Sequence, residues 1–406
     1  MNNQSILYIS YDGMLAPLGQ SQVLAYLKRL AVGRCIHLIS FEKPEDWVNV
    51  TERQCIAQDI VAAGIIWHPL SYHKRPSALA TGWDIVCGIT LGLWLVLRHH
   101  LCIVHARSYV PSVMALALKR LTGVKYVFDM RGFWADERVD GGLWKCSGKM
   151  FRIAKGFERH FLLAADHVVS LTQAAVLEMQ CFDYLQERMP KFEVITTCAD
   201  LNLFKYEEAH QIRHENSFNL GYVGSVNVSY QFDETLKCFK LLQQMIPDAR
   251  LHILNRGEHD YILERLSCHQ IDLQSVRLEA TDHAGVVRAM CQMDAGIFFI
   301  KQVYSKMASA PTKLGEFLGC GIPCLANTGV GDMGTILEKE HVGIALQNFT
   351  EDSMRDAVDR LIKLSREQGI KRRCRRVAME YFSLEMGIEK YNKIYCSLLS
   401  DESVRE

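Results

Sequence analysis

The chain has 406 residues, and at about 150 residues per domain this length predicts two or three domains. Forty-six Lys and Arg residues balance forty-six Asp and Glu residues, so the formal net charge is zero. A neutral chain lacks the positive field that general nucleic-acid binding requires, and we therefore expect no nucleic-acid partner. With 49% hydrophobic and 23% charged residues, the composition also excludes a disordered or collagen-like chain.

The fourteen cysteines are scattered along the chain and form no CxxC pair; the closest two are Cys320 and Cys324. The first residues, Met1–Ser5, lack the basic region of a secretory signal. Both observations favour free thiols in a reducing compartment, so a cytoplasmic protein is expected. One local cluster of potential ligands is spaced too closely across a predicted strand to favour a metal site: His99, His100, Cys102 and His105.

Short apolar segments alternate with helical segments in the first half of the chain. Strands are predicted at residues 6–10, 36–41, 65–70, 103–106 and 125–129. Helices are predicted at residues 21–27, 83–97 and 110–121. This alternation is typical of a parallel sheet that helices cover on both faces.

Within this half, residues 85–97 form a run of thirteen uncharged residues between Asp84 and Arg98. A helix that spans a membrane needs about 20 apolar residues. The run therefore predicts a buried or interfacial helix rather than a membrane-spanning one.

A second series with the same alternation follows the polar stretch 207–217. Strands are predicted at residues 218–224, 250–254, 276–278, 295–300 and 323–326. Helices are predicted at residues 232–244, 283–292 and 312–319, and a further helix at 383–399 ends the chain. The sequence therefore predicts an α/β protein with two doubly wound, Rossmann-like domains, residues 1–205 and 206–380. Ligands are expected at the carboxyl ends of the strands.

Residues 305–323 carry the most informative pattern, because a helix begins there directly after a buried strand. Ser309 is the predicted N-cap, and Pro311 suits the first turn. The free N–H groups and the positive dipole of such a helix start favour a phosphate, and Lys313 adds a full positive charge. Glu316, three residues further on the same face, could accept hydrogen bonds from paired ribose hydroxyls. The alternative is an ordinary surface pair between Lys313 and Glu316.

The stretch SAPTKLGEFLGCGIPCLAN (309–327) resembles the donor-binding segment of GT-B glycosyltransferases of family 4. Other stretches resemble the same family in the same order: MLAPLGQSQVLAYLKRLA near the N-terminus, FDMRGFWADERVDGGLW at 128–144, VITTCADLNLF at 194–204, GYVGSVNVSY, and FSLEMGIEKYNKIY near the C-terminus. The resemblance spans nearly the whole chain.

The resemblance implies a GT-B fold in which the C-terminal domain binds a nucleotide-diphosphate sugar and the N-terminal domain binds the acceptor. It also implies that the C-terminal helix, residues 383–402, packs back on the first domain. The implied reaction transfers a sugar with retention and needs neither a metal nor a cofactor. Without a metal, N–H groups, hydroxyls and basic side chains must stabilise the leaving diphosphate. The predicted donor-binding residues are Gly19, Gly224, Ser225, Arg256, Ser309, Thr312, Lys313, Glu316 and Asp332.

Two departures from the family pattern bear on the donor. Many members carry two glutamates eight positions apart; Glu316 matches the second, but Ala308 stands where the first would be. Many members also have basic residues directly after the glycine at 224, whereas Ser225 and Val226 follow it here. Lys313 must then carry more of the phosphate charge, with Arg256 as a candidate helper.

In the first domain, Gly13 and Gly19 bracket a loop at a strand end, where glycines would let the backbone approach a ligand; the alternative is a plain turn. Charged and aromatic residues also follow the strands at 103–106 and 125–129. The predicted catalytic residues are Asp129, Arg131, Glu137 and His105. The predicted acceptor-binding residues are Trp134 and Arg107. A structural role is the alternative for His105.

Residues 141–160 carry five basic side chains against Glu158 alone, and four of them share a helical face. One interpretation is a peripheral contact with the inner membrane surface; the other is a solvated face of a core helix. The second basic run, 371–376, is interpreted as a solvated helix face.

The favoured hypothesis is a glycosyltransferase that uses a nucleotide-sugar donor and a saccharide or lipid-linked acceptor in surface-polysaccharide or glycolipid assembly. One alternative is a catalytically silent nucleotide-sugar-binding subunit. Another is a nucleotide-sugar epimerase of the same fold. A dehydrogenase is disfavoured because no GxGxxG follows the first strand.

Overall fold

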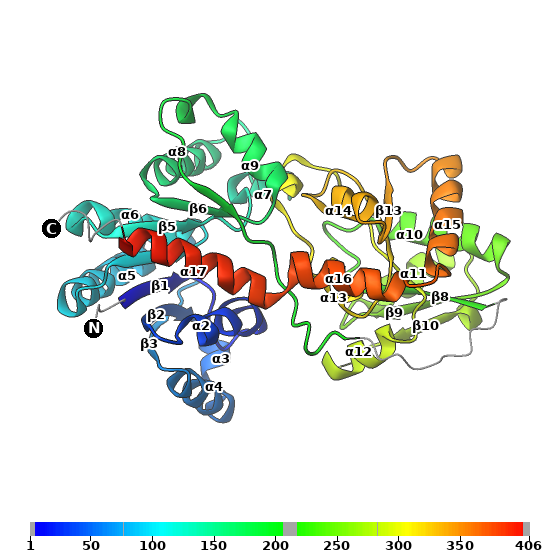
Figure 1. The fold of residues 1–406 in the computed structure, drawn as a ribbon, viewed down its shortest axis with the longest axis horizontal. Coiled ribbons are helices and arrows are strands. Elements are labelled where there is room, and N and C mark those ends of the chain that lie inside the picture. Colours follow the sequence, from blue (N-terminus) through cyan, green and yellow to red (C-terminus); the bar gives the residue numbers. More distant parts are fainter. Residues whose placement is uncertain (1–4, 76, 206–216, 282, 401–406) are drawn as a thin grey trace. The chain divides into compact units, whose positions relative to one another are not determined.

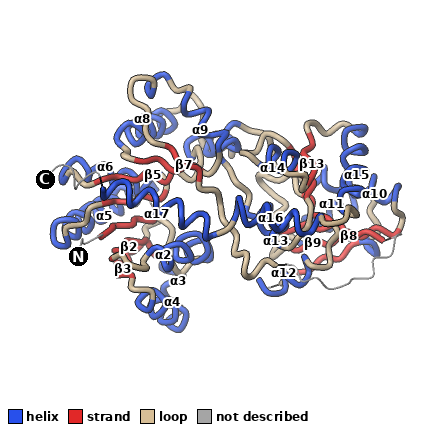
Figure 2. Tube along the Cα trace, in the orientation of Figure 1, coloured by secondary structure: helices blue, strands red, loops and turns tan. Residues whose placement is uncertain are grey.

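The computed structural model describes residues 5–75, 77–205, 217–281 and 283–400. The chain forms two compact units (Figures 1 and 2). The first unit comprises Met1–Ile195 together with Gly387–Glu406, and the second comprises Thr196–Met386. The division lies ten residues before the boundary expected at 205/206, and the end of the chain returns to the first unit.

The first unit is built on a seven-stranded sheet in which every pair is parallel. Its strands lie in the order β3-β2-β1-β4-β5-β6-β7. Their bounds are β1 (Ser5–Ser10), β2 (Cys35–Glu42), β3 (Ile65–Ser71), β4 (Ile103–Arg107), β5 (Lys125–Asp129), β6 (His167–Ser170) and β7 (Phe192–Val194). Every residue of β1 is buried, because helices cover both faces of a parallel sheet.

Most helices of this unit connect successive strands. They are α1 (Pro17–Gly19), a π-helical turn (Gln20–Leu24), α2 (Ala25–Leu30), α3 (Pro44–Trp47), α4 (Val50–Ala62), α5 (Ser77–His99), α6 (Tyr109–Thr122), α7 (Trp134–Asp140), α8 (Lys149–Ala164), α9 (Gln173–Gln180) and a 3₁₀ turn (Asp183–Leu185). The last helix of the chain, α17 (Leu384–Ser400, red in Figure 1), belongs to this unit from Gly387 onward.

The second unit has a six-stranded parallel sheet in the order β10-β9-β8-β11-β12-β13. Its strands are β8 (Ser217–Val223), β9 (Asp248–Leu254), β10 (Val276–Glu279), β11 (Ala295–Ile297), β12 (Cys324–Asn327) and β13 (Gly343–Leu346). Its helices are α10 (Phe232–Met245), α11 (His259–Cys268), α12 (His283–Met290), α13 (Thr312–Gly319), α14 (Met333–Lys339), α15 (Glu351–Ser365) and α16 (Ile370–Phe382), with 3₁₀ turns at Leu273–Ser275 and Tyr304–Ala308.

In both sheets the first strand lies inside, and the chain leaves it first in one direction and then in the other, as in a Rossmann sheet. The predicted fold class, two doubly wound α/β halves, is therefore confirmed. Three short strands, β6, β7 and β13, were not predicted; each has only three or four residues.

Several predicted elements have different limits in the structure. The apolar helix predicted at 83–97 extends over Ser77–His99, and its segment Ala78–His99 is long and apolar enough to cross a membrane by length and composition. The strand predicted at 295–300 ends at Ile297. The basic helix predicted within 141–160 begins only at Lys149, after Gly148.

The interpretation of 371–376 as a solvated face was wrong for Arg375. Its guanidinium is partly buried and donates hydrogen bonds to the carbonyl oxygens of Leu201 (2.6 Å) and Gly319 (3.1 Å) and to that of Phe204. Arg375 thus ties α16 to the end of α13 and to the segment before residue 205. The periodicity of charges could not reveal this, because the acceptors are backbone groups far away in sequence.

Candidate functional site

Lys313, in the first turn of α13, is the only buried lysine among the described residues, with 9% of its surface exposed. Its ammonium group lies 3.7 Å from the ring centroid of Tyr230 and 4.9 Å from that of Tyr222. Phe298 adds a third ring at 5.9 Å. Nζ has no hydrogen-bond partner in the described part of the chain. The electron-rich ring faces attract the cation but accept none of its three N–H donors in an ordinary hydrogen bond.

The environment of Lys313 opposes its charge. Burial lowers the pKa of Lys313 to about 7, although the carboxyl group of Glu316 acts in the opposite direction. Burial likewise raises the pKa of Glu316 to about 7, and Lys313 partly offsets this rise. An anion placed beside Lys313 would restore its full charge and supply the missing acceptors.

The turn after β8 is shaped to admit this lysine. Gly224 has φ of +97°, a conformation that favours glycine. A Cβ atom at this position would lie 2.9 Å from Cε of Lys313 and 3.1 Å from Nζ. The backbone conformation therefore requires glycine, and a Cβ atom here would displace the end of the lysine side chain.

A cavity of about 300 Å³ adjoins this turn within the second unit. It brings together four of the predicted donor-binding residues, and its wall also includes Asn255, Glu258 and Thr281. The four predicted residues are Gly224, Ser225, Arg256 and Glu316. Arg256 is exposed, and its Nε donates to the carbonyl oxygen of Thr281 at 3.2 Å.

Glu258 was not predicted, yet its carboxylate organises the wall of the cavity. It accepts hydrogen bonds from Ser225 Oγ (3.0 Å), the Val226 N–H (3.1 Å) and Asn255 Nδ2 (2.8 Å). Burial acts to raise the pKa of Glu258, but the hydrogen bonds from Asn255, Ser225 and Val226 hold it below the usual value. The sequence signal that could have indicated Glu258 is its position in the turn after β9, the turn from which only Arg256 was predicted as a donor-binding residue.

Three further predicted donor residues, Ser309, Thr312 and Asp332, lie in the second unit at or just before helix starts. Thr312 is the first residue of α13, and Asp332 directly precedes α14. Ser309 was wrongly predicted as the N-cap, because Pro311 occupies that position. A proline disfavours helical backbone in the residue before it, so Ala310 cannot be the first helical residue that an N-cap at Ser309 would require. No side chain caps the first turn of α13.

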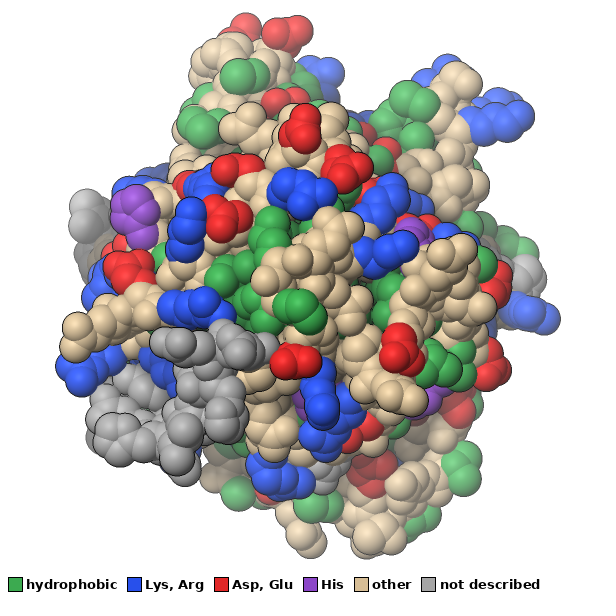
Figure 3. Space-filling model, turned by 90° about the vertical axis from the view of Figure 1, so that its right-hand side faces the viewer, with side chains coloured by type: hydrophobic (Ala, Val, Ile, Leu, Met, Phe, Trp, Pro, Cys, Tyr) green, Lys and Arg blue, Asp and Glu red, His purple; other side chains and the backbone are tan. Residues whose placement is uncertain are grey.

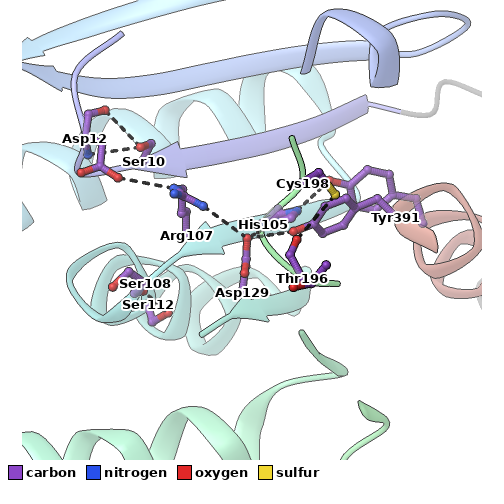
Figure 4. A network of polar contacts seen from close by, with 11 residues as sticks. Ser10, Asp12, His105, Arg107, Ser108, Ser112, Asp129, Thr196, Cys198 and Tyr391 are labelled. Atoms are coloured by element: carbon purple, nitrogen blue, oxygen red, sulfur yellow. Dashed lines mark hydrogen bonds and ion pairs between the residues drawn. The ribbon is translucent and has the colours of Figure 1, made fainter. Parts of the chain in front are cut away.

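At the carboxyl edge of the first sheet, charged side chains from three adjacent strand ends meet. Arg107 lies between Asp12 and Asp129 (Figure 4), with Nε 3.4 Å from Asp12 Oδ2 and Nη1 3.9 Å from Asp129 Oδ2. His105 Nε2 lies 3.6 Å from the same oxygen of Asp129. Parallel pairing of β4 with β5 sets Arg107 opposite Asp129, so neighbouring strands bring the charges together.

Two tyrosines of α17 complete this cluster. Tyr391 donates from its hydroxyl to Asp129 Oδ2 at 3.0 Å, and the Tyr395 hydroxyl lies 2.6 Å from His105 Nδ1. The two tyrosines are four residues apart and therefore share one face of the helix. The return of the C-terminal helix to the first unit thus reaches the predicted catalytic residues directly.

Arg131 follows β5 in a strained conformation, with φ of +61°, and Gly132 after it has φ of +138°. Burial acts to lower the pKa of Arg131, but the charge of Asp129 more than offsets this and raises it. Burial also acts to raise the pKa of Asp129, yet Arg131, His105 and Arg107 together hold it below its usual value. Burial lowers the pKa of His105 despite the opposing effect of Asp129.

The other predicted residues of this unit lie on separate elements. Trp134 begins α7, is half-buried, and packs against Tyr109 (5.5 Å) and Trp144 (5.2 Å). Glu137 lies one turn further along α7. The structure thus groups His105, Arg107, Asp129 and Arg131 and places Trp134 and Glu137 on a neighbouring helix.

The loop between β1 and α1 is fixed by a carboxylate that sequence reasoning missed. Glu42 accepts hydrogen bonds from the N–H groups of Met14 (2.8 Å) and Leu15 (3.1 Å). A Cβ atom on Gly13 would lie 2.7 Å from Glu42 Oε2, and one on Gly19 only 2.0 Å from the Gly13 carbonyl oxygen. Packing inside the loop therefore already requires both glycines, and two of its N–H groups are engaged.

No group of three or more His, Cys, Asp or Glu side chains is arranged to hold a metal ion within the described residues. All fourteen cysteines lie in the described ranges and are free thiols.

Comparison with solved structures finds close similarity over the full chain. A glycosyltransferase from Rickettsia africae has a TM-score of 0.70 at 14% identity, covering 98% of this chain and 99% of that one. Sucrose-phosphate synthase from Thermosynechococcus elongatus gives 0.68 at 12% identity, covering 98% and 100%. Anabaena Alr3699/HepE, solved in complex with UDP-glucose, gives 0.65 at 14% identity, covering 97% and 99%.

This chain has the GT-B fold, as the sequence resemblance implied. The identities are low, so the comparison establishes the fold alone. No protein-family model matches the sequence, and no curated protein matches it. Membership of family 4 stays a prediction.

Proposed function

We propose that the chain is a retaining glycosyltransferase of family 4 that takes a sugar from a nucleotide-diphosphate sugar. The acceptor is a saccharide or a lipid-linked saccharide in surface-polysaccharide or glycolipid biosynthesis, in the cytoplasm. The observation that carries the donor assignment is the buried ammonium group of Lys313, which has no hydrogen-bond partner among the described residues. It lies beside a cavity lined by Gly224, Ser225 and Glu316.

The chemistry of this site suits a diphosphate. Lys313 would donate to the phosphate oxygens through charge-assisted hydrogen bonds, and the uncapped N–H groups at the start of α13 would add neutral donors. When the bond between the sugar and the diphosphate breaks, negative charge develops on the leaving oxygen, and these groups would stabilise it without a metal. Glu316 at the cavity wall would accept hydrogen bonds from ribose hydroxyls.

Structural neighbours support a nucleotide-sugar donor. Anabaena HepE has been solved with UDP, with UDP and glucose, and with UDP-glucose. Two further neighbours are glycosyltransferases of lipopolysaccharide assembly, WaaB (TM-score 0.65, 12% identity) and WaaG (0.61, 14%). These neighbours motivate the proposed donor class and pathway.

For the acceptor side we propose the strand-end cluster of the first unit. Asp129, His105 and Arg131 are the candidates for orienting the acceptor and moving its proton, with Arg107 and Trp134 in acceptor binding. Asp129 Oδ1 and His105 Nε2 are buried without a hydrogen-bond partner among the described residues, so both could still accept or donate a bond to a ligand. Glu137 is the more distant candidate for proton transfer.

A catalytically silent nucleotide-sugar-binding subunit remains the second candidate. Ala308 replaces the first of the two family glutamates, and its side chain is buried with 1% exposed. Such a protein would bind the donor through Lys313 and Glu316 but would not transfer the sugar.

A panel of nucleotide-diphosphate sugars, screened by thermal shift, tests the proposal. A ligand that binds only the folded state raises the melting temperature by mass action, so one or a few donors should stand out. Donor hydrolysis with the selected compound then separates an enzyme from a silent subunit. If no nucleotide sugar and no nucleoside diphosphate raises the melting temperature, the donor assignment is wrong.

A further inference from the structure

The outer surface of one helix layer in the first unit differs from the rest of the protein in both polarity and charge. Helix α5 packs beside α6, and α6 packs beside α8. The exposed side chains of α5 form a stripe with the spacing of one helix face. The large exposed apolar residues of α5 are Leu79, Trp83, Val86, Trp94 and Leu97, each between 53% and 75% exposed.

The one polar side chain within this stripe does not interrupt it. Thr90 continues the spacing, and its hydroxyl donates to the carbonyl oxygen of Val86 at 2.8 Å, inside the helix itself. The stripe runs from Leu79 to Leu97, about 27 Å along the axis at 1.5 Å per residue. Helix α8 adds three exposed apolar residues at i, i+3 and i+7: Met150, Ile153 and Phe157.

The opposite side of α5 is packed against protein, which excludes a membrane-spanning role for the helix in this fold. A Cβ atom on Gly88 would lie 2.4 Å from Met114 Sδ, and one on Gly92 would lie 2.9 Å from Leu118 Cδ1. These glycines let α6 approach closely along its length. Helix α5 is apolar enough to span a membrane, yet only one of its faces is available.

Acidic side chains are missing from the outer surface of this layer. Helix α6 contains no acid, and the other two helices contain one each, Asp84 and Glu158. Both are buried. Asp84 accepts from the Tyr11 hydroxyl at 2.7 Å and contacts the His73 ring, while Glu158 pairs with Lys155 and the Tyr109 hydroxyl.

Basic side chains, by contrast, are exposed on all three helices. They are Arg98, Arg120, Lys149, Arg152 and Arg159. More widely, residues 61–128 contain seven Lys and Arg residues and the single acid Asp84. The second unit offers a contrast: on α15, Arg355 pairs with Glu351 and Lys363 with Asp359, and blue and red side chains are intermixed on the face shown in Figure 3.

We infer that the outer face of α5 and α8 binds the surface of an anionic lipid bilayer, with α5 lying in the plane of the membrane. Leucine, valine and tryptophan side chains would enter the boundary between headgroups and acyl chains, where tryptophan is favoured. The exposed arginines and lysines would attract anionic headgroups, and no exposed acid on these helices would repel them. This inference does not depend on the donor or on catalysis.

Co-sedimentation of the full-length protein with vesicles tests the inference. The wild-type protein should bind vesicles that contain phosphatidylglycerol more tightly than vesicles of phosphatidylcholine alone. The double variant W83Q/W94Q should lose at least about tenfold in vesicle affinity, because both interfacial side chains are gone. The matched control W47Q/V48Q removes two exposed apolar side chains, from the last residue of α3 and the residue directly after it, and should bind as the wild type does.

A charge variant separates the two parts of the surface. R98E/R120E should lose the preference for phosphatidylglycerol while its melting temperature stays unchanged, since both arginines are exposed. The inference is overturned if W83Q/W94Q binds vesicles as tightly as the wild type does. It is also overturned if the wild-type protein binds neither kind of vesicle. Sedimentation velocity tests whether a second copy of the chain covers the stripe instead. If the wild-type protein is a dimer that binds no vesicles, and W83Q/W94Q is a monomer, the stripe is a dimer interface and the inference is wrong.

Discussion

The carboxyl edges of the two sheets each carry buried charge, but the charges are arranged in opposite ways. In the first unit, Arg107 and Arg131 surround Asp129, and the charges compensate one another. In the second unit, Lys313 lies over aromatic rings and its ammonium group has no hydrogen-bond partner among the described residues. A cluster of paired charges is stable without a ligand. The ammonium group of Lys313 lacks a counter-ion at hydrogen-bond distance among the described residues, so binding of an anion there should release the larger interaction free energy.

Removing the central charge of the first cluster should give the largest effect on stability. In Asp129→Asn, Arg107 and Arg131 lose their shared counter-charge inside the protein, which should cost about 3 kcal/mol of unfolding free energy. Urea denaturation measures the loss. Asp12→Asn is the control, because Asp12 is 42% exposed and contacts only the outer side of Arg107.

The same variant also tests whether the two edges are independent. Nucleotide-sugar affinity of Asp129→Asn should stay within about twofold of the wild type, since Lys313 lies in the other unit and shares no partner with Asp129. An unchanged urea midpoint would show that the charges of the first cluster do not depend on Asp129.

The second edge should respond to pH through Lys313. Its pKa of about 7 means that half of the ligand-free protein carries the charge near neutrality, and almost none carries it at pH 9. A diphosphate favours the charged form, so affinity should fall as pH rises from 7 to 9, on the order of tenfold or more. Calorimetric titration of the nucleotide sugar at several pH values measures this.

Lys313→Arg provides the matched control for the pH profile, because a guanidinium stays protonated throughout this range. Glu316 still titrates in this variant, since its pKa also lies at about 7, but its ionised fraction at most doubles above pH 7. The affinity of the variant should therefore change by no more than about twofold between pH 7 and 9. A wild-type profile as flat as that of the variant would contradict the role of lysine protonation.

A smaller effect is expected at Glu316. In Glu316→Gln, the carboxylate proposed to accept from the ribose hydroxyls becomes an amide, and affinity for the nucleotide sugar should fall roughly threefold to tenfold. Discrimination between the ribose and the 2′-deoxyribose form of the ligand should fall as well. A variant that changes only its melting temperature would make Glu316 a structural residue.

Much of the fold followed from local patterns, and the misses have local causes. Short apolar segments predicted the ten other strands, including the four-residue strand β12. Strands β6, β7 and β13 have only three or four residues, and so short a segment gives little periodic signal. Pro311 overrode the N-cap signal of Ser309 because a proline restricts the residue before it.

The candidate site could be predicted only in part. Spacing indicated Lys313 and Glu316 together, but the rings around the lysine come from separate elements, such as Tyr222 on β8 and the loop residue Tyr230. The carboxylates of Glu42 and Glu258 were missed because backbone groups that donate to them lie far away in sequence. Glu42 accepts from the Met14 N–H, and Glu258 accepts from the Val226 N–H.

Lys313 is proposed to bind the diphosphate of the donor, and calorimetric titration of a nucleotide-diphosphate sugar into Lys313→Ala is the decisive test. Affinity should fall about 30-fold or more, because charge-assisted hydrogen bonds to the phosphates are lost. The melting temperature of the ligand-free variant should not fall by a comparable amount, since the buried ammonium group contacts aromatic rings but has no hydrogen bond to lose within the described residues. Lys240→Ala, which removes an exposed lysine from α10, should bind as the wild type does. Unchanged affinity in Lys313→Ala would rule out phosphate binding by Lys313.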